Sequence, residues 1–128
     1  FARQSRVGSH TVATTPAVRN ELSDRAIEAQ VESLICYRII SMQERGEIPN
    51  KESSIAKLFS SELDLRLATT AMHLGGLYSQ FTSHDDPHAL GGRFPRFYMH
   101  STTSPIGGGT SEIQRNIIAM RGLGLPRG

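Results

Sequence analysis

The residues best placed to do chemistry form a glycine-rich turn, Gly107-Gly108-Gly109, which leads into Thr110-Ser111-Glu112. The free N–H groups and the dipole of a helix start favour an anion, so phosphate binding is one interpretation of this turn. No lysine follows the glycines and no predicted strand precedes them, which excludes a Walker loop and a dinucleotide-binding fingerprint. The plainer interpretation is that Thr110 caps the last helix and the glycines only turn the chain.

Two other groups of residues have the types needed for metal or thiol chemistry. His84-Asp85-Asp86 and His88 resemble a metal cluster, but polar residues crowded around a proline favour a solvated turn over a metal site. Cys36 is the only cysteine, so the chain has no internal disulfide. Its apolar helical surroundings predict a buried structural thiol. We therefore expect no metal site.

A long first helix is predicted to begin at Thr14, Thr15 and Pro16, where a capping hydroxyl precedes a proline in the first turn. Gly46 and Pro49 end it. Its apolar stripe, which predicts a bundle core, comprises Val18, Leu22, Ala26, Ala29, Ser33, Cys36 and Ile40, widened by Val31, Leu34, Ile35 and Ile39.

A second helix is predicted from a capping Asn50 to Phe81, with Gly75-Gly76 inside it. Glycines within a helix cost about 1 kcal/mol each, so this pair indicates the helix end or the close approach of another helix or a cofactor. Residues 82–109 lack periodicity and predict a long loop. A last helix is predicted from about Thr110 to Arg121, and no strand pair is evident. The fold class is therefore all-α.

Length and composition exclude several classes of protein. A chain of 128 residues corresponds to one domain, which can bury roughly two-thirds of its unfolded surface in a self-sufficient core. The net charge is only +2, and basic residues such as Arg25 and Arg66 alternate with acidic ones such as Glu28, which predicts a solvated face rather than a nucleic-acid surface. No stretch approaches the ~20 apolar residues that span a bilayer. We expect a cytoplasmic protein without a nucleic-acid or membrane partner.

The tail of the chain closely resembles the C-terminal signature of acyl-CoA dehydrogenases. The matching residues are Gly109-Thr110-Ser111-Glu112-Ile113-Gln114-Arg115-Asn116-Ile117-Ile118-Ala119 and Gly122-Leu123-Gly124-Leu125-Pro126-Arg127. Weaker resemblances are Arg96-Phe97-Tyr98, Gly75-Gly76, and Ala2-Arg3 with Gly8. The resemblance implies that residues 1–128 are the family's C-terminal helical domain, a four-helix bundle with a truncated first helix, and that the N-terminal helical and middle β-domains are absent.

The family's chemistry implies a cofactor, a substrate and partners. In acyl-CoA dehydrogenases a carboxylate removes the α-proton of an acyl-CoA thioester while flavin adenine dinucleotide (FAD), which lies between subunits, takes the β-hydride. The resemblance therefore implies FAD, an acyl-CoA substrate from a fatty acid or a steroid side chain, and a homo- or hetero-oligomer. It also implies electron-transfer flavoprotein as a partner.

The resemblance also implies which residues meet the flavin. Thr110 and Glu112 correspond to contacts with its nucleotide part, and Gly75-Gly76 corresponds to the backbone that a neighbouring subunit's flavin approaches. Arg3 and Arg6 compete for the pyrophosphate contact, and the pattern slightly favours Arg3.

Three departures from the family pattern fall at this site. The frequent catalytic glutamate corresponds to Gly108, which has no side chain, and the flavin-binding glutamine corresponds to Met72, whose thioether is only a weak acceptor. The usual Arg-Asp corresponds to Met99-His100. His73 offers a substitute donor beside Met72, although a histidine at such a position more often lies hydrogen-bonded in the core.

Three functions are compatible with these departures. The first is an ordinary dehydrogenase whose base lies upstream of these residues. The second, which the departures favour, is a catalytically degenerate subunit that completes the flavin site of a related, active partner. The third is a non-enzymatic helical interaction module, which the specific tail signature disfavours.

Overall fold

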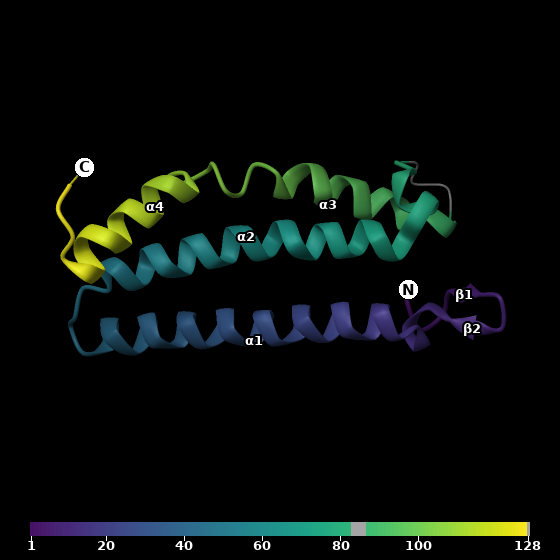
Figure 1. Cartoon of the computed structure of the whole chain (residues 1–128), viewed down its shortest axis with the longest axis horizontal. Coiled ribbons are helices and arrows are strands. Elements are labelled where there is room, and N and C mark those ends of the chain that lie inside the picture. The colour runs from purple at the N-terminus through teal and green to yellow at the C-terminus, as the bar shows by residue number, and fades with distance from the viewer. Residues whose placement is uncertain (83–86, 128) are drawn as a thin grey trace.

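The computed structural model describes residues 1–82 and 87–127, with only the backbone described for residues 87–89. In chain order the elements are β1 (Arg6–Val7), β2 (His10–Thr11), the 3-10 helix η1 (Val12–Thr14), α1 (Pro16–Glu44), α2 (Asn50–Gly75), the 3-10 helices η2 (Gly76–Gln80) and η3 (Pro87–Gly92), α3 (Arg93–Ser101), α4 (Ser111–Ile117) and its π-helical extension η4 (Ile118–Gly122). Figure 1 shows α2 in the middle, with α1 along one side and α3 and α4 in succession along the other. The described residues thus confirm an all-α chain of four α-helices.

The predicted helix starts are correct, but only one of the three predicted caps forms. α1 begins at Pro16 as expected, whereas the Thr15 side chain makes no capping hydrogen bond. Pro49 holds the N-cap position of α2, so Asn50 is its first helical residue rather than its cap. Thr110 does cap α4, because its side chain accepts a hydrogen bond from the Ile113 N–H.

The paired glycines mark both a helix end and a close approach. α2 ends at Gly75, six residues before the predicted end, and the chain continues as η2. A Cβ atom on Gly75 would lie 2.7 Å from Ser79 Cβ and 2.9 Å from Phe94 Cδ2. Since real Cβ atoms do not approach other atoms so closely, only glycine lets η2 and α3 pack against this end of α2.

Two regions of the chain contradict the sequence prediction. The predicted loop over residues 82–109 contains η3 and α3, and α3 packs against α2. Pro95 lies in the first turn of α3, where the missing N–H costs no helical hydrogen bond, so the proline does not break the helix. A strand pair also exists, with Arg6 opposite Thr11 and Val7 opposite His10. Two-residue strands are too short to show an alternating pattern.

The long helix α1 differs most from its prediction. None of its 29 residues is buried, and the predicted core stripe is largely solvent-exposed, Cys36 included. The partly buried residues that recur at steps of three and four along α1 are Val18, Glu21, Arg25, Glu28, Glu32, Ile35, Ile39 and Met42. Half of these residues are charged. Hydrophobic periodicity identified the apolar faces of α1 correctly but not the face that packs on α2.

Ion pairs hold α1 against α2 where apolar contacts were expected. Glu28 lies between two guanidinium groups, with its carboxylate 3.0 Å from Arg25 Nε and 2.9 Å from Arg66 Nε. Glu62, one turn before Arg66, pairs in addition with Arg115 of α4. The predicted solvated charged face is therefore in part an interhelical network that links α1, α2 and α4.

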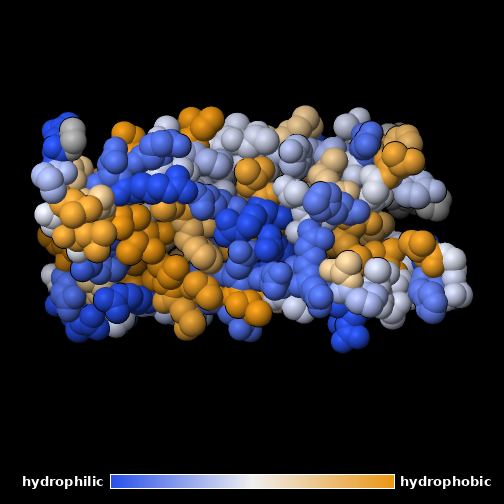
Figure 2. Space-filling model, in the orientation of Figure 1, coloured by the Kyte–Doolittle hydropathy of each residue, from blue (hydrophilic) through white to orange (hydrophobic). Residues whose placement is uncertain are grey.

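The apolar core is much smaller than the self-sufficient core predicted from length. Among the described residues, the buried hydrophobic ones are Val12, Leu63 and Ala68. The accessible surface is 8712 Å², whereas a compact monomer of 14.0 kDa exposes about 6,700 Å². Figure 2 shows apolar residues gathered over the C-terminal half of α1 and the neighbouring C-terminal segment, with a charged belt across the middle. The chain therefore leaves about 2,000 Å² more surface exposed than a compact monomer of its mass does.

None of the described helices is both long and apolar enough to cross a bilayer.

Candidate functional site

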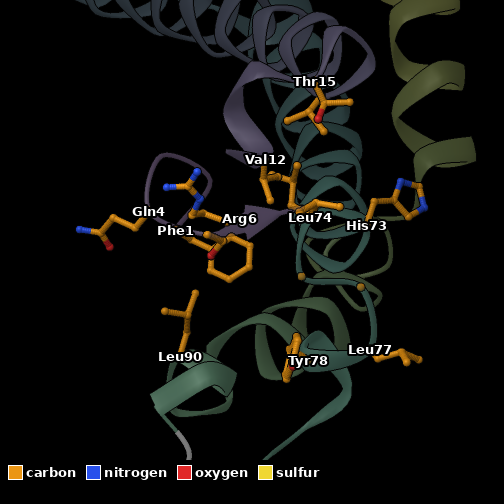
Figure 3. Close-up of a pocket in the computed structure, with 15 residues that line it drawn as sticks. Phe1, Gln4, Arg6, Val12, Thr15, His73, Leu74, Leu77, Tyr78 and Leu90 are labelled. Carbon is orange, nitrogen blue, oxygen red and sulfur yellow. The ribbon is translucent and has the colours of Figure 1, made fainter. Parts of the chain in front are cut away.

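A cavity of about 800 Å³ lies at the end of the bundle where α2 stops. The N-terminal segment forms one side of it, and the end of α2 with η2 forms the other (Figure 3). Its lining consists of Phe1, Gln4, Ser5, Arg6, Val7, Val12, Thr15, Val18, His73, Leu74, Gly75, Gly76, Leu77, Tyr78 and Leu90.

Backbone hydrogen bonds fix the N-terminal side of the cavity. The Val12 N–H donates to Ser5 O at 2.9 Å, and the Ala13 N–H donates to Ala2 O at 2.8 Å, so the segment before β1 is tied to η1. The Phe1 ring packs edge-on against Phe94 of α3, with ring centroids 5.5 Å apart. These contacts hold the N-terminal segment across from the end of α2.

Arg6 and the glycine pair meet in this cavity, whereas Arg3 does not line it. The Arg6 guanidinium donates to Ser9 O at 2.9 Å, which leaves further donors of its planar fork for another acceptor. No atom lies within 4 Å of a Cβ placed on Gly76, so its backbone is open to the cavity. A cationic side chain and an uncovered backbone that line one cavity suit a phosphate-bearing ligand.

His73 lies at the edge of the cavity and is not a core histidine. Its imidazole is exposed, with Nδ1 3.4 Å from Glu21 Oε1 of α1, and the same oxygen accepts a hydrogen bond from Thr70 Oγ1 at 2.7 Å. Figure 3 shows the ring directed away from Phe1 and Arg6. The histidine therefore contributes to the contact between α1 and α2. Because its ring points away from Arg6, it does not supply a hydrogen-bond donor there in place of the glutamine predicted to correspond to Met72.

The glycine-rich turn is held from both sides by polar side chains. The buried Gln114 of α4 donates from Nε2 to Gly108 O at 3.1 Å, and a Cβ on Gly109 would lie 2.8 Å from that same nitrogen. From α2, Lys57 Nζ donates to Ser104 O at 3.2 Å. The turn is therefore fixed in place by Gln114 and Lys57.

Gly108, which the resemblance implies to correspond to the family's catalytic glutamate, is a left-handed glycine near a lysine. Gly108 has φ +69°, a region that disfavours any residue with a side chain. A Cβ placed there would be 3.9 Å from Lys57 Cε, an ordinary contact distance. Sequence reasoning overlooked Lys57, because nothing in the pattern of α2 shows which residue faces the turn.

Thr110 and Glu112 interact with the backbone N–H groups at the start of α4. Thr110 Oγ1 accepts from the Ile113 N–H at 3.4 Å. The backbone N–H of Glu112, the Thr110 hydroxyl and the nearby Arg115 hold the pKa of the Glu112 carboxyl below its usual value. Because these side chains interact with the first-turn donors, the arrangement favours the capping interpretation of the turn over a free anion site.

The site residues predicted from the sequence fall into two separate groups. Gly108 lies against Lys57, whereas Gly75 is 18 residues further along α2 (75 − 57 = 18), or about 27 Å at the rise of an α-helix. Figure 1 shows α4 and the β1–β2 hairpin at opposite ends of the molecule. One chain therefore does not bring Thr110 and Glu112 together with Arg6 and the glycine pair.

The remaining sequence candidates add no further site. Residues 84–86 lie outside the described residues, as does the His88 side chain, so the metal cluster considered above has no structural description. No group of three or more potential metal-binding side chains occurs in the part of the chain that is described. Met99 and His100 are exposed on α3, and the Arg96 guanidinium donates to Gly91 O.

Known proteins resemble this chain in both sequence and fold. A family model described as acyl-CoA dehydrogenase, C-terminal domain, matches residues 1–123. The acyl-CoA dehydrogenase FadE26 of Mycobacterium tuberculosis is 34% identical over 104 residues, which cover 78% of this chain and 26% of that protein.

Solved structures agree with the family match. A chain of the ChsE4-ChsE5 complex from Mycobacterium tuberculosis superposes with a TM-score of 0.86 and 32% identity, covering 99% of this chain and 33% of that one. The Tcur3481-Tcur3483 steroid ACAD shares the fold, with a TM-score of 0.83 and 22% identity over 91% of this chain and 30% of its own. The chain spans about a quarter to a third of the length of these relatives. It belongs to the acyl-CoA dehydrogenase family, and residues 1–123 correspond to the C-terminal domain of that family.

Proposed function

We propose that the complete protein is a cytoplasmic, FAD-dependent acyl-CoA dehydrogenase, and that this domain forms part of its flavin site and of its subunit interface. The observation that carries the proposal is the cavity that Arg6 lines together with Gly75 and Gly76, in which the backbone of Gly76 is open. When bound, FAD supplies the acceptor for the β-hydride of an acyl-CoA. The residues of this chain bind and orient the cofactor and hold its phosphates.

Arg6 is the proposed contact for the flavin pyrophosphate, in place of the Arg3 that the family pattern slightly favoured. Arg6 lines the cavity together with the glycines and Arg3 does not, which supports this assignment. Arg6→Leu in the complete protein should weaken FAD binding about tenfold or more, as the loss of a charged hydrogen bond does, while the matched Arg3→Leu change should alter it less than twofold. Titration of the apoprotein with FAD measures both, and equal effects would argue against Arg6.

A flavin site shared between subunits accounts for the two separate groups of residues. The separation of about 27 Å along α2 supports a site in which one chain supplies Arg6, Gly75 and Gly76 and a neighbouring chain supplies Thr110 and Glu112. Under this proposal each chain takes part in two flavin sites. Electron-transfer flavoprotein is the proposed acceptor of the electrons that the flavin receives.

The residue at the expected position of the catalytic base favours a second function. Gly108 carries no base and Met72 no amide, so the chain is also proposed as a catalytically degenerate subunit that completes the site of an active partner. The left-handed backbone of Gly108 supports this alternative, because a glutamate there would be strained. So does the structural relative at 32% identity, which forms a complex of two differently named proteins.

Purification of the complete protein, alone and with a related subunit, distinguishes the two functions. A degenerate subunit should lack flavin absorbance and acyl-CoA turnover when alone and should gain both with its partner. Stoichiometric flavin and turnover in the homo-oligomer would reject that function and support an ordinary dehydrogenase whose base lies upstream of these residues. If neither preparation binds FAD, the flavin proposal itself fails and the non-enzymatic interaction module gains support.

A further inference from the structure

Leu90 lines the cavity from a strained backbone. Its φ of 48° and ψ of 37° are left-handed, and among the described residues it is the only one with a side chain that has a positive φ. This conformation is unfavourable for leucine, whereas glycine adopts it freely. Residues strained in this way persist only where their surroundings hold them, and they cluster at ligand sites. The leucine therefore needs a physical explanation, because a glycine would fold here without strain.

Contacts around Leu90 hold the turn in this conformation. The next two residues, Gly91 and Gly92, are also left-handed. A Cβ atom on Gly92 would lie 2.5 Å from Thr82 O, so these two backbone segments pack directly against each other. From α3, the Arg96 guanidinium donates to Gly91 O. These contacts fix the turn and, with it, the direction of the leucine side chain.

The turn directs Leu90 to an apolar part of the cavity. Figure 3 shows its side chain pointing from η3 toward Phe1. The Phe1 ring is itself held in place by its edge-on contact with Phe94. Leu90 is only partly exposed. The cavity lining thus combines apolar side chains, Phe1 and Leu90 among them, with the cationic Arg6 and the open backbone of Gly76.

A lining of this composition suits a ligand that joins phosphate to a ring. The guanidinium of Arg6 offers charged hydrogen bonds to phosphate oxygens, which a purely apolar ligand would leave unused. Burial against Leu90 favours an apolar or aromatic group and contributes nothing to the binding of a bare phosphate. The cavity volume of about 800 Å³ lies within the range of small-molecule sites. A nucleoside diphosphate carries both kinds of group.

We propose that Leu90 is a specificity-determining residue of this cavity, which packs against the ring of a nucleoside diphosphate group whose phosphates Arg6 binds. The inference rests on the proposed function and deepens it, because FAD contains such a group. It assigns recognition of the ring to a residue of η3, which belongs neither to the tail signature nor to the glycine pair.

Binding of adenosine diphosphate (ADP) and of pyrophosphate separates the two parts of this recognition. In the complete protein in its native assembly, freed of FAD, Leu90→Ala should weaken ADP and FAD about tenfold in calorimetric titration, because the ring loses an apolar contact. Pyrophosphate has no ring, so its competition with ADP should give an inhibition constant that changes less than about twofold. Leu90→Met, which keeps the apolar volume, should bind ADP within about threefold of wild type. Arg6→Leu should weaken both ligands.

Stability distinguishes this role from packing within the chain. Leu90→Gly removes both the side chain and the strain, so it should unfold at a urea concentration no lower than Leu90→Ala and still bind ADP about tenfold more weakly than wild type. ADP binding that is unchanged in both variants, or pyrophosphate binding weakened as much as ADP binding, would overturn the proposal. If the wild type binds FAD, such a result leaves the flavin proposal standing. A wild type that binds neither FAD nor ADP would overturn both.

Discussion

Introducing a glutamate at position 108 is the most informative perturbation of this chain. Gly108 adopts φ +69°, and a residue with a side chain in the left-handed region costs about 1–2 kcal/mol. Space is not limiting, because the nearest atom to an added Cβ is Lys57 Cε at 3.9 Å. Gly108→Ala should therefore destabilise the protein by about 1–2 kcal/mol through backbone strain alone.

The same geometry predicts that Gly108→Glu is less damaging than Gly108→Ala. The glutamate carboxylate can reach the Lys57 ammonium, and a partly exposed ion pair contributes about 0.2–1 kcal/mol, which offsets part of the strain. The ammonium also lowers the proton affinity of that carboxylate, which makes it a weaker base for an α-proton. We expect Gly108→Glu alone to produce little α-proton exchange and Gly108→Glu with Lys57→Met to produce more.

Two assays check this reasoning in the complete protein. Urea unfolding gives the order of stability, which should be wild type, then Gly108→Glu, then Gly108→Ala. Deuterium uptake at the α-carbon of a bound acyl-CoA reports the base independently of hydride transfer. A neutral or stabilising Gly108→Ala change would refute the left-handed conformation, and a Gly108→Glu variant less stable than the alanine variant would refute the proximity of Lys57.

Three further predictions concern packing, the ionic network and pH. Gly92→Ala should destabilise the protein by about 2–5 kcal/mol in urea unfolding, because the added Cβ would lie 2.5 Å from Thr82 O on a left-handed backbone, and a neutral result would contradict that contact. Glu28→Gln should cost about 1–3 kcal/mol because it leaves two arginines of a partly buried network uncompensated, whereas the same change at the exposed Glu47 should cost less than ~1 kcal/mol; equal losses would mean that the network contributes nothing beyond surface pairing. The pKa of Glu112 is lowered in the folded state from its ordinary value of 4.5. The ionised carboxylate therefore stabilises the protein fully at pH values above that ordinary pKa, and this stabilisation is lost as the pH falls through the lowered pKa. The difference in melting temperature between wild type and Glu112→Gln should therefore be present at pH 7 and disappear in acid, and a difference that grows in acid would contradict the direction of the shift.

Local signals were sufficient for most of the secondary structure. Pro16 marked the start of α1, because a proline restricts the allowed backbone angles regardless of what surrounds it. The glycine pair at 75 and 76 indicated a helix end as one alternative, although the helix itself was predicted to continue to Phe81. α3 was overlooked, since its nine residues follow two glycines and contain a proline, which together resemble a loop. Only its packing against α2 stabilises such a short helix.

The residues of the candidate site were likewise predicted only in part from the sequence. The prediction that Gly108 corresponds to the family's glutamate rests on the sequence alone, since the tail motif fixes its position relative to Thr110. The choice between Arg3 and Arg6 and the presence of Lys57 beside Gly108 did not, because both depend on contacts between segments far apart in the chain. The exposure of Cys36 was also unpredictable, because an apolar face has the same pattern whether it packs inside the bundle or against another subunit.

The sequence by itself determined that this chain is helical, that it belongs with acyl-CoA dehydrogenases, and that no carboxylate occupies position 108, since composition, periodicity and short motifs are properties of neighbouring residues. The tertiary structure decided which face of α1 meets α2, and that the two groups of flavin-contact candidates lie at opposite ends of α2. The physical reason is that burial and charge pairing depend on the relative placement of whole helices. Ion pairs such as Glu28 with Arg66 turned a charged face inward and left the apolar faces of α1 exposed.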